Sequence, residues 1–421
     1  MSRIRSYNEI ILILLLVLSE KGKNEFLLLI VLFQLIIYIL KYGIYIRVFN
    51  ICKYLIYIFI IAFIMSSIHI FYNNYLIKDI LRDSYIMITP IVYIFYGAYC
   101  CYLGKNDKIS IFRSVVTAGI IISLIHISKV ILNINIVLLD INNRDIAGTG
   151  SVITIIAIII LNFSYKNNVK IFAKNRKRKF IKNIILIISF ILYFSRTDIA
   201  LLLCFLGSIM LIHKKINIIK ISKVSILSII MCVAIYVILP KNIVHTFINK
   251  TINSINEVSS ESTEIWDWYS INNNWRGYEV YRSKETINNG NILDIALGYG
   301  MGKAVELNTE ILLGEQIYSR ITILHNGYYY LLLKSGIFGL IMYILFLIKI
   351  LFINIKSIIS ENKVFESQLL CGVSLGIIFS TIVVSGIYNK GSIFSYCLII
   401  GYFSVYNSKE VENTKLGSKK I

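Results

Sequence analysis

A chain of 421 residues is long enough for two or three soluble domains, but 57% of its residues are hydrophobic and its mean hydropathy is +0.73. Apolar runs recur from end to end, many near the ~20 residues that a helix needs to cross a bilayer. Runs such as FLLLIVLFQLIIYIL (26–40) lack the alternation typical of barrel strands. The composition therefore excludes a soluble enzyme and predicts an all-α polytopic integral membrane protein.

The chain opens with MSRIRSYNEIILILLLVLSEKGK, which has the basic residues and short apolar core of a signal peptide but no small-residue cleavage site. We therefore expect an uncleaved first span, followed by further spans to a total of about 12 transmembrane helices. The expected spans are 7–20, 25–40, 51–72, 85–103, 115–132, 148–164, 183–196, 198–213, 224–239, 326–353, 367–386 and 391–407.

The run 183–213 is long enough to be read as a single helix, but it is interrupted by the quartet Ser195-Arg196-Thr197-Asp198. Charged groups in the middle of a bilayer cost several kcal/mol. We therefore predict a tight hairpin that places this quartet at the membrane surface and splits the run into two spans.

The basic residues set the orientation. The net charge of +20 is concentrated in segments such as SYKNNVKIFAKNRKRKFIKN (164–183), which lie inside if the N-terminus is inside. This placement favours contact with anionic membrane lipid over nucleic acid, and it predicts a protein of the cytoplasmic membrane.

The same orientation places one long polar loop outside. We predict three parts: 1–239 with transmembrane helices 1–9, the large extracytoplasmic loop 240–322, and 323–421 with helices 10–12 and a cytoplasmic tail. The loop contains all three tryptophans and is long enough for a few helices packed on the membrane.

Several common sites are absent from the sequence. It contains no GxxxxGK[ST] phosphate loop, no HExxH, no zinc-type Cys/His spacing and no Asp-x-Asp pair. The seven cysteines lie in or beside apolar segments, so a disulfide framework is not expected. Few ionisable residues lie deep in the spans, which is unlike a proton-coupled transporter.

The remaining polar residues gather, by this topology, on the outer side. Each has a structural interpretation as well as a functional one. Arg196 could contact lipid phosphate, the glycines of GYGMG could form a simple turn, and His325 could cap a helix. Lys334 could snorkel toward the surface, and EIWDWYSINNNW (264–275) could be an interfacial aromatic belt or a sugar-stacking platform.

Taken together, four stretches resemble the superfamily of O-antigen polymerases and O-antigen ligases. HNGYYYLLLKSGIFGLIMYILF (325–346) is similar to its His-Asn pair, apolar helix and Gly-x-x-Gly step, although Lys334 stands where an acidic residue is often seen. YFSRTDIALLL (193–203) resembles its Ser-Arg motif, and NNRDIAGTGSVITII (142–156) its Arg-Asn/Asp-x-x-Gly element. WRGYEVYRSKETINNGNILDIALGYGMG (275–302) resembles its Arg-led helix and Gly-rich turn.

The resemblance implies a class-C-type glycosyltransferase fold and the transfer of an undecaprenyl-diphosphate-linked oligosaccharide to a sugar hydroxyl, with no metal, nucleotide or other cofactor. It implies that Arg196 and Arg276 hold the diphosphate and that His325 accepts the proton of the acceptor. The residues carried over as substrate-binding are Arg144, Arg282, Asn326 and Trp275.

The leading interpretation is a polymerase that joins lipid-linked repeat units into capsular polysaccharide or the O-antigen of lipopolysaccharide. A flippase and a chain-length regulator are its expected protein partners. A ligase that uses the same donor with another acceptor stays open. A flippase for the lipid-linked glycan is an alternative from another class, but it would need a charged central cavity and no large outer loop.

Overall fold

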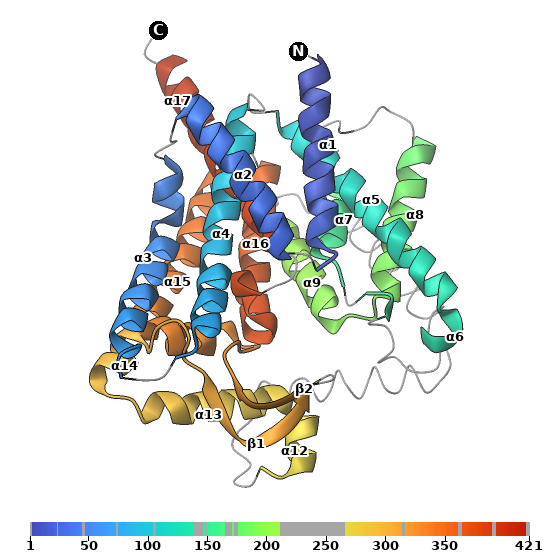
Figure 1. Cartoon of the computed structure of the whole chain (residues 1–421). Coiled ribbons are helices and arrows are strands. Elements are labelled where there is room, and N and C mark those ends of the chain that lie inside the picture. Colours follow the sequence, from blue (N-terminus) through green and yellow to red (C-terminus); the bar gives the residue numbers. More distant parts are fainter. Residues whose placement is uncertain are drawn as a thin grey trace. The chain divides into compact units, whose positions relative to one another are not determined.

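A computed structural model describes residues 2–22, 24–43, 47–72, 75–103, 107–137, 146–148, 150–164, 171, 176–210, 266–313, 316–360, 364–389 and 393–417. These residues are mainly helical, with a single two-stranded sheet among them (Figure 1). The chain forms two compact units. Unit 1 comprises Met1–Val17 and Ile109–Asn256, and unit 2 comprises Leu18–Lys108 and Glu257–Ile421.

Six helices in the described part of the chain are long and apolar enough to cross a membrane. They are Asn24–Tyr42, Val48–His69, Ile77–Leu103, Lys108–Leu132, Gly327–Ile359 and Phe365–Val384. All six coincide with predicted spans, which confirms a multi-pass helical membrane protein. Shorter apolar helices stand at three other predicted spans: Asn8–Ser19, Val152–Phe163 and Ile393–Asn407. The predicted span 224–239 lies outside the described residues.

The predicted break in the run 183–213 is confirmed in unit 1. Helix α8 (Arg176–Leu192) ends before α9 (Arg196–Met210), and Phe194 between them has a φ of 46°. The hydroxyl oxygen of Ser195 accepts a hydrogen bond of 3.2 Å from the backbone N–H of Asp198, so Ser195 caps α9. Helix α7 (Val152–Phe163) packs on both α8 and α9. The remaining helices of this part are α1 (Ser2–Ser19), α5 (Lys108–Leu132) and α6 (Ile134–Val137).

Unit 2 is built on a bundle of long helices. Helix α4 (Ile77–Leu103) packs on α17 (Ile393–Gly417), and α15 (Gly327–Ile359) packs on α16 (Val364–Val384) and on α3 (Arg47–His69). Helix α2 (Asn24–Tyr42) lies against α4. The contact of α4 with α17 is close because a Cβ at Gly401 would stand 2.0 Å from the carbonyl oxygen of Ile94. Small residues at such crossings let two membrane helices approach each other.

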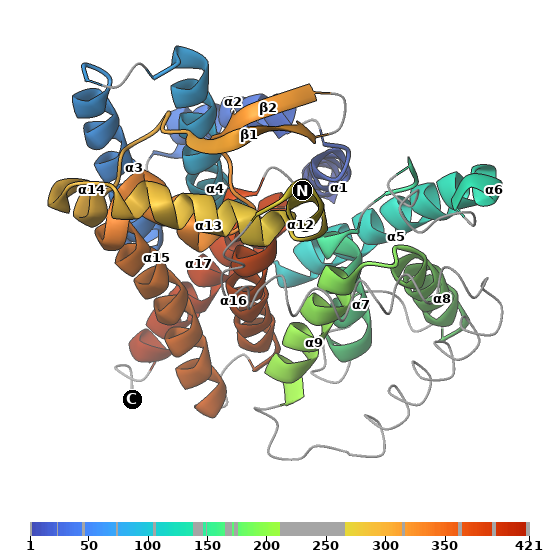
Figure 2. The ribbon, with the colours of Figure 1, turned by 90° about the horizontal axis from the view of Figure 1, so that it is seen from below.

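The segment before α15 crosses the end of this bundle (Figures 1 and 2). It contains α12 (Trp268–Asn273), α13 (Trp275–Asn288), α14 (Ile292–Leu297) and the antiparallel strands β1 (Val305–Leu313) and β2 (Gln316–Ile321). The expected helices are present, but the sequence interpretation missed the hairpin. Its signal was the alternation of buried Val305 and Leu307 with exposed Glu306 and Asn308.

A glycine-rich loop, residues 298–302, ties this segment into the bundle. Helix α15 is interrupted at Gly336, whose φ is 62° and ψ is −165°. The carbonyl groups of Leu333 and Lys334 beside that kink accept hydrogen bonds from the N–H groups of Tyr299 (2.9 Å) and Gly300 (3.1 Å). The kink at Gly336, within the predicted Gly-x-x-Gly step, is thus where the GYGMG loop docks, and this loop is the turn that connects α14 to β1.

The fit at Gly300 leaves no room for a side chain, and this predicts a large cost for Gly300→Ala. Gly300 has a φ of +84°, and a Cβ there would stand 2.1 Å from the backbone nitrogen of Ser66. We expect the variant to lose about 3 to 5 kcal/mol of unfolding free energy, from left-handed strain and overpacking together. Thermal or denaturant unfolding in detergent micelles measures this loss.

Gly43→Ala is the matched control, because Gly43 has a similar φ of +74° and a Cβ added there would meet nothing within 4 Å. It should lose only the strain, about 1 to 2 kcal/mol. Equal losses in the two variants would show that the close approach of the loop to α3 contributes nothing.

Candidate functional site

His325 stands immediately before α15 and is held there by the main chain. The helix cap is its neighbour Asn326, whose side-chain oxygen accepts from the N–H groups of Tyr328 (3.0 Å) and Tyr329 (3.4 Å). The N–H of Ser385, at the end of α16, donates to the carbonyl of His325 at 2.6 Å. Asn326 is thus used as a cap, and the imidazole of His325 is left for another role.

The imidazole is paired with a buried carboxylate. Nδ1 of His325 lies 2.9 Å from both carboxylate oxygens of Glu279, and the backbone N–H of His325 donates to Oε2 of Glu279 at 3.1 Å. The side chain of Glu279 is 3% exposed, whereas that of His325 is 47% exposed. An ionised Glu279 accepts the Nδ1–H and so directs the lone pair of Nε2 away from itself. Among the described residues, Nε2 has no hydrogen-bonding partner.

Such a pair can take up a proton from a bound hydroxyl group. Nε2 accepts the proton, and the carboxylate at Nδ1 stabilises the imidazolium that forms and fixes the orientation of the ring. The carboxylate therefore acts by positioning and by charge, while the imidazole exchanges the proton.

The other predicted residues of unit 2 lie on the same helix as Glu279. Trp275 and Arg276 form the first turn of α13 and are half-buried, and the ring of Trp275 lies 6.2 Å from that of Tyr278. Residues three apart share one face of a helix, so α13 places Arg276 on the face that carries Glu279.

The guanidinium of Arg282 is bonded to other residues of the segment α12–β2. It is 8% exposed, its Nε donates to the carbonyl of Glu306 at 2.8 Å, and its Nη1 bonds to the carboxylate of Glu285. The hydroxyl group of Tyr278 donates to the carbonyl of Leu307, and burial raises the pKa of Tyr278, which keeps it a donor. Arg282 and Tyr278 thus fasten α13 to β1.

Arg196 belongs to unit 1, in the first turn of α9. The carboxylate of Asp198, two residues later, accepts a hydrogen bond of 3.1 Å from the backbone N–H of Ser151, which caps α7. This contact joins the Ser-Arg motif to the end of the predicted NNRDIAGTGS element (142–151). Arg144, in the first half of that element, lies outside the described residues.

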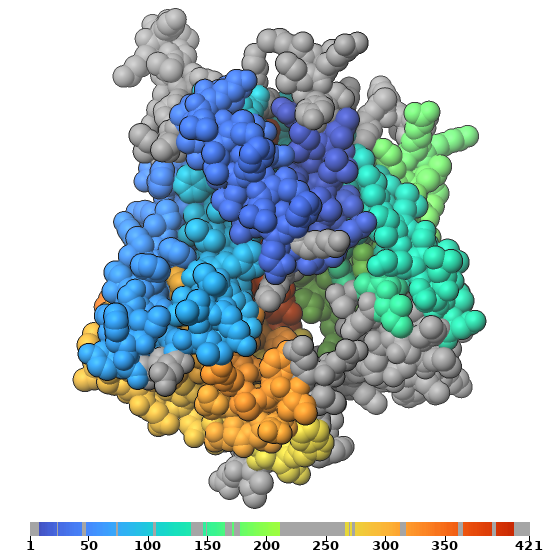
Figure 3. Space-filling view, in the orientation of Figure 1, coloured from blue at the N-terminus to red at the C-terminus, as the bar shows by residue number. Residues whose placement is uncertain are grey.

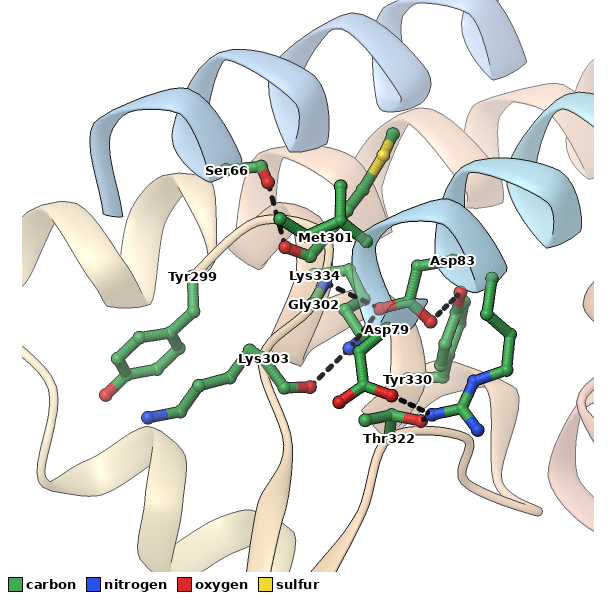
Figure 4. A network of polar contacts seen from close by, with 12 residues as sticks. Ser66, Asp79, Asp83, Tyr299, Met301, Gly302, Lys303, Thr322, Tyr330 and Lys334 are labelled. Atoms are coloured by element: carbon green, nitrogen blue, oxygen red, sulfur yellow. Dashed lines mark hydrogen bonds and ion pairs between the residues drawn. The ribbon is translucent and has the colours of Figure 1, made fainter. Parts of the chain in front are cut away.

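The interpretation of Lys334 as a snorkelling residue is wrong. Its Nζ lies 2.6 Å from Oδ2 of Asp83 on α4, and both side chains are 0% exposed (Figure 4). Asp83 also accepts from the N–H of Gly302 (2.8 Å) and from the hydroxyl of Tyr330 (3.4 Å), and Nζ of Lys334 bonds to the carbonyl of Lys303. A buried ion pair requires such partners, because isolated charges are costly to desolvate. The pair fixes the glycine-rich loop between α4 and α15.

Sequence reasoning missed Glu279 and Asp83. Glu279 lies in the stretch RGYEVYRSKETI, and a helical wheel would have placed it with Tyr278 and Arg282 on one face. Asp83 had a weaker signal, because it is an acidic residue about two turns into a largely apolar helix and its partner lies 251 residues away in the chain.

No group of three or more His, Cys, Asp or Glu side chains in the described ranges is arranged to hold a metal ion. The chain matches no family model and no curated protein in sequence comparisons, so the likeness to the O-antigen polymerases and ligases rests on the four stretches named above.

Proposed function

We propose that this protein is a glycosyltransferase that polymerises undecaprenyl-diphosphate-linked oligosaccharide repeat units at the outer surface of the cytoplasmic membrane. On this proposal the chain has about 12 spans, a class-C-type fold and an extracytoplasmic segment 240–322. The observation that carries the proposal is the His325–Glu279 pair, in which a half-exposed imidazole is backed by a buried carboxylate at the start of a membrane helix.

The reaction requires one base and one stabiliser of negative charge. Nε2 of His325 removes the proton from the acceptor hydroxyl, the hydroxyl oxygen bonds to the anomeric carbon of the donor sugar, and the bond from that carbon to the diphosphate breaks. The lipid diphosphate leaves with the electron pair. Guanidinium groups of Arg196 and Arg276 stabilise that charge as the bond breaks.

Glu279 supports this assignment because it gives the imidazole a fixed orientation and a counter-charge at the moment of proton transfer. Arg282 is given no role in the reaction, because its guanidinium already holds α13 to β1. We assign Trp275 and Arg276, which lie on the first turn of α13, to the sugar and the diphosphate of the donor.

A ligase would use the same donor and the same groups, and it would differ only in its acceptor. The flippase alternative is not favoured, because moving a lipid across the membrane requires neither the large segment α12–β2 nor the His325–Glu279 pair.

The test is reconstitution. Purified protein in liposomes, given lipid-diphosphate repeat units and a chelator but no nucleotide sugar, should lengthen the glycan by whole repeat units. Product length is read on a gel or by mass spectrometry. Absence of extension with correctly folded protein would remove the polymerase proposal, and transfer to a different added acceptor only would favour the ligase.

Arg196→Lys is expected to slow extension at least about tenfold, although it keeps the positive charge. A guanidinium binds two phosphoryl oxygens in parallel, and an ammonium group binds as a point charge. Steady-state rates at saturating donor measure the effect, with the exposed Lys284→Arg as a control for charge-conserving exchange. Wild-type rates in Arg196→Lys would argue against bidentate binding of the diphosphate there.

A further inference from the structure

Two guanidinium groups that the reaction above does not use share one buried carboxylate in unit 2. On the first turns of α4, Nη2 of Arg82 lies 2.8 Å from Oδ1 of Asp79 and also bonds to the hydroxyl of Thr322. From β2, Nη2 of Arg320 lies 4.0 Å from Oδ2 of the same carboxylate. Figure 4 shows Asp79 and Thr322 in this network, and in the space-filling view the orange strands lie against the light-blue start of α4 (Figure 3).

The charge of this patch is unbalanced. The neighbouring Asp83 is neutralised by Lys334, so Asp79 is the carboxylate left for both guanidiniums. Glu306 faces Arg320 across the strand pair, and Lys78 is exposed beside Asp79. The patch therefore has three positively charged side chains (Lys78, Arg82 and Arg320) and two carboxylates (Asp79 and Glu306).

The two guanidiniums are positioned but only partly used. The side chains of Arg82 and Arg320 are 36% and 40% exposed, whereas Asp79 is 5% exposed. In the described part of the chain, Nε of Arg82 is buried with no hydrogen-bonding partner. That Nε is itself out of reach of an external group, but Asp79 holds both guanidiniums from behind, so the exposed part of each side chain can meet an external acceptor. Phosphoryl oxygens suit such paired guanidiniums.

The patch is joined to the segment that carries His325. Thr322, which bonds to Arg82, precedes His325 by three residues, a stretch of at most ~11 Å even when fully extended. Neither guanidinium contacts His325 or Glu279 among the described residues. A group bound here lies near the base without touching it.

We infer that Arg82 and Arg320 bind the phosphoryl headgroup of a lipid-anchored substrate, namely the acceptor. In the donor, the diphosphate is bonded directly to the reacting carbon, so its site must adjoin the reaction centre. In a lipid-linked acceptor, the glycan separates the reacting hydroxyl from the diphosphate. The acceptor therefore requires a second phosphoryl site that does not adjoin His325. The identity of the lipid rests on the proposed function, but the binding itself does not.

The test measures binding without glycosyl transfer. The protein, in nanodiscs of zwitterionic phosphatidylcholine, is titrated with a short-chain prenyl diphosphate, and the corresponding prenyl alcohol is the blank. We expect two sites per chain in the wild type and in the exposed control Lys284→Gln. In Arg320→Gln, one site should weaken at least about tenfold, since a charge-assisted contact is lost. Arg82→Gln should do the same.

Arg320→Gln is the primary variant, because Arg320 is 40% exposed and its contact of 4.0 Å to Asp79 is long, so we expect its removal to disturb the fold least. If phosphatidylglycerol in the nanodisc competes for the site that Arg320→Gln weakens, ordinary anionic phospholipid supplies the headgroup and the phosphoryl site stands. A single site that Arg320→Gln abolishes would keep this inference and remove the donor site of the proposed function instead. Unchanged affinity and stoichiometry in both arginine variants would overturn it.

Discussion

Glu279→Gln is expected to lower kcat for glycan extension by about 10²-fold or more and to leave KM for the lipid-linked substrate nearly unchanged. The glutamine has the same shape and can still accept the backbone N–H of His325, which donates to Oε2 of Glu279 at 3.1 Å. It lacks the negative charge that stabilises the imidazolium, and its amide can present a donor to Nδ1, which selects the wrong tautomer. On the proposed function, Glu279 is a positioning residue, and His325 is the group that exchanges the proton.

His325→Ala is the reference for the loss of kcat in Glu279→Gln, since loss of a general base lowers rates by about 10² to 10⁴-fold. Initial rates over a range of substrate concentrations separate kcat from KM in both variants. Glu279→Asp should recover part of the rate, because the carboxylate is kept. A Glu279→Gln enzyme with normal kcat, or one that differs only in KM, would contradict the assignment of Glu279.

Lys334→Met is expected to destabilise the protein by about 3 to 5 kcal/mol, because it leaves the carboxylate of Asp83 buried without its counter-ion. Both side chains are fully buried and 2.6 Å apart. The double variant Asp83→Leu, Lys334→Met removes both charges, so its loss should be smaller than the sum of the two single losses. A double-mutant cycle on unfolding free energies in micelles measures this coupling.

Lys356→Met is the control, since Lys356 lies on the same helix and is exposed. It should change stability by less than about 0.5 kcal/mol. Additive losses in the double variant would show that the two charges do not stabilise each other.

Much of the helical architecture could be predicted because hydrophobicity acts locally. Apolar runs predicted the long helices, and the quartet Ser195–Asp198 predicted the break between α8 and α9, since a cap and charges cannot be accommodated inside a span. The strands β1 and β2 were missed because their alternation covers only a few residues in a loop rich in helix formers.

The partners of the charged residues could not be predicted from the sequence, for a different reason. Asp83 and Lys334 meet across 251 positions of sequence, and Glu279 and His325 across 46. Nothing local distinguishes a lysine that snorkels from one that is paired in the interior. Only the docking of the 298–302 loop into the kink at Gly336 brings these elements together. The histidine at the start of α15 was recognised from its motif, and the carboxylate behind it was not.

On the proposed function, Arg196 and His325 act on the outer side of the membrane, where a lipid diphosphate and its glycan would be presented. Labelling of single cysteines at positions 196 and 325 in intact cells, with a membrane-impermeant thiol reagent, tests it most directly. We expect both positions to react from outside before the membrane is permeabilised, as should a Lys284→Cys control in the segment 240–322, which the proposed function places outside. Reaction at either position only after permeabilisation would contradict it.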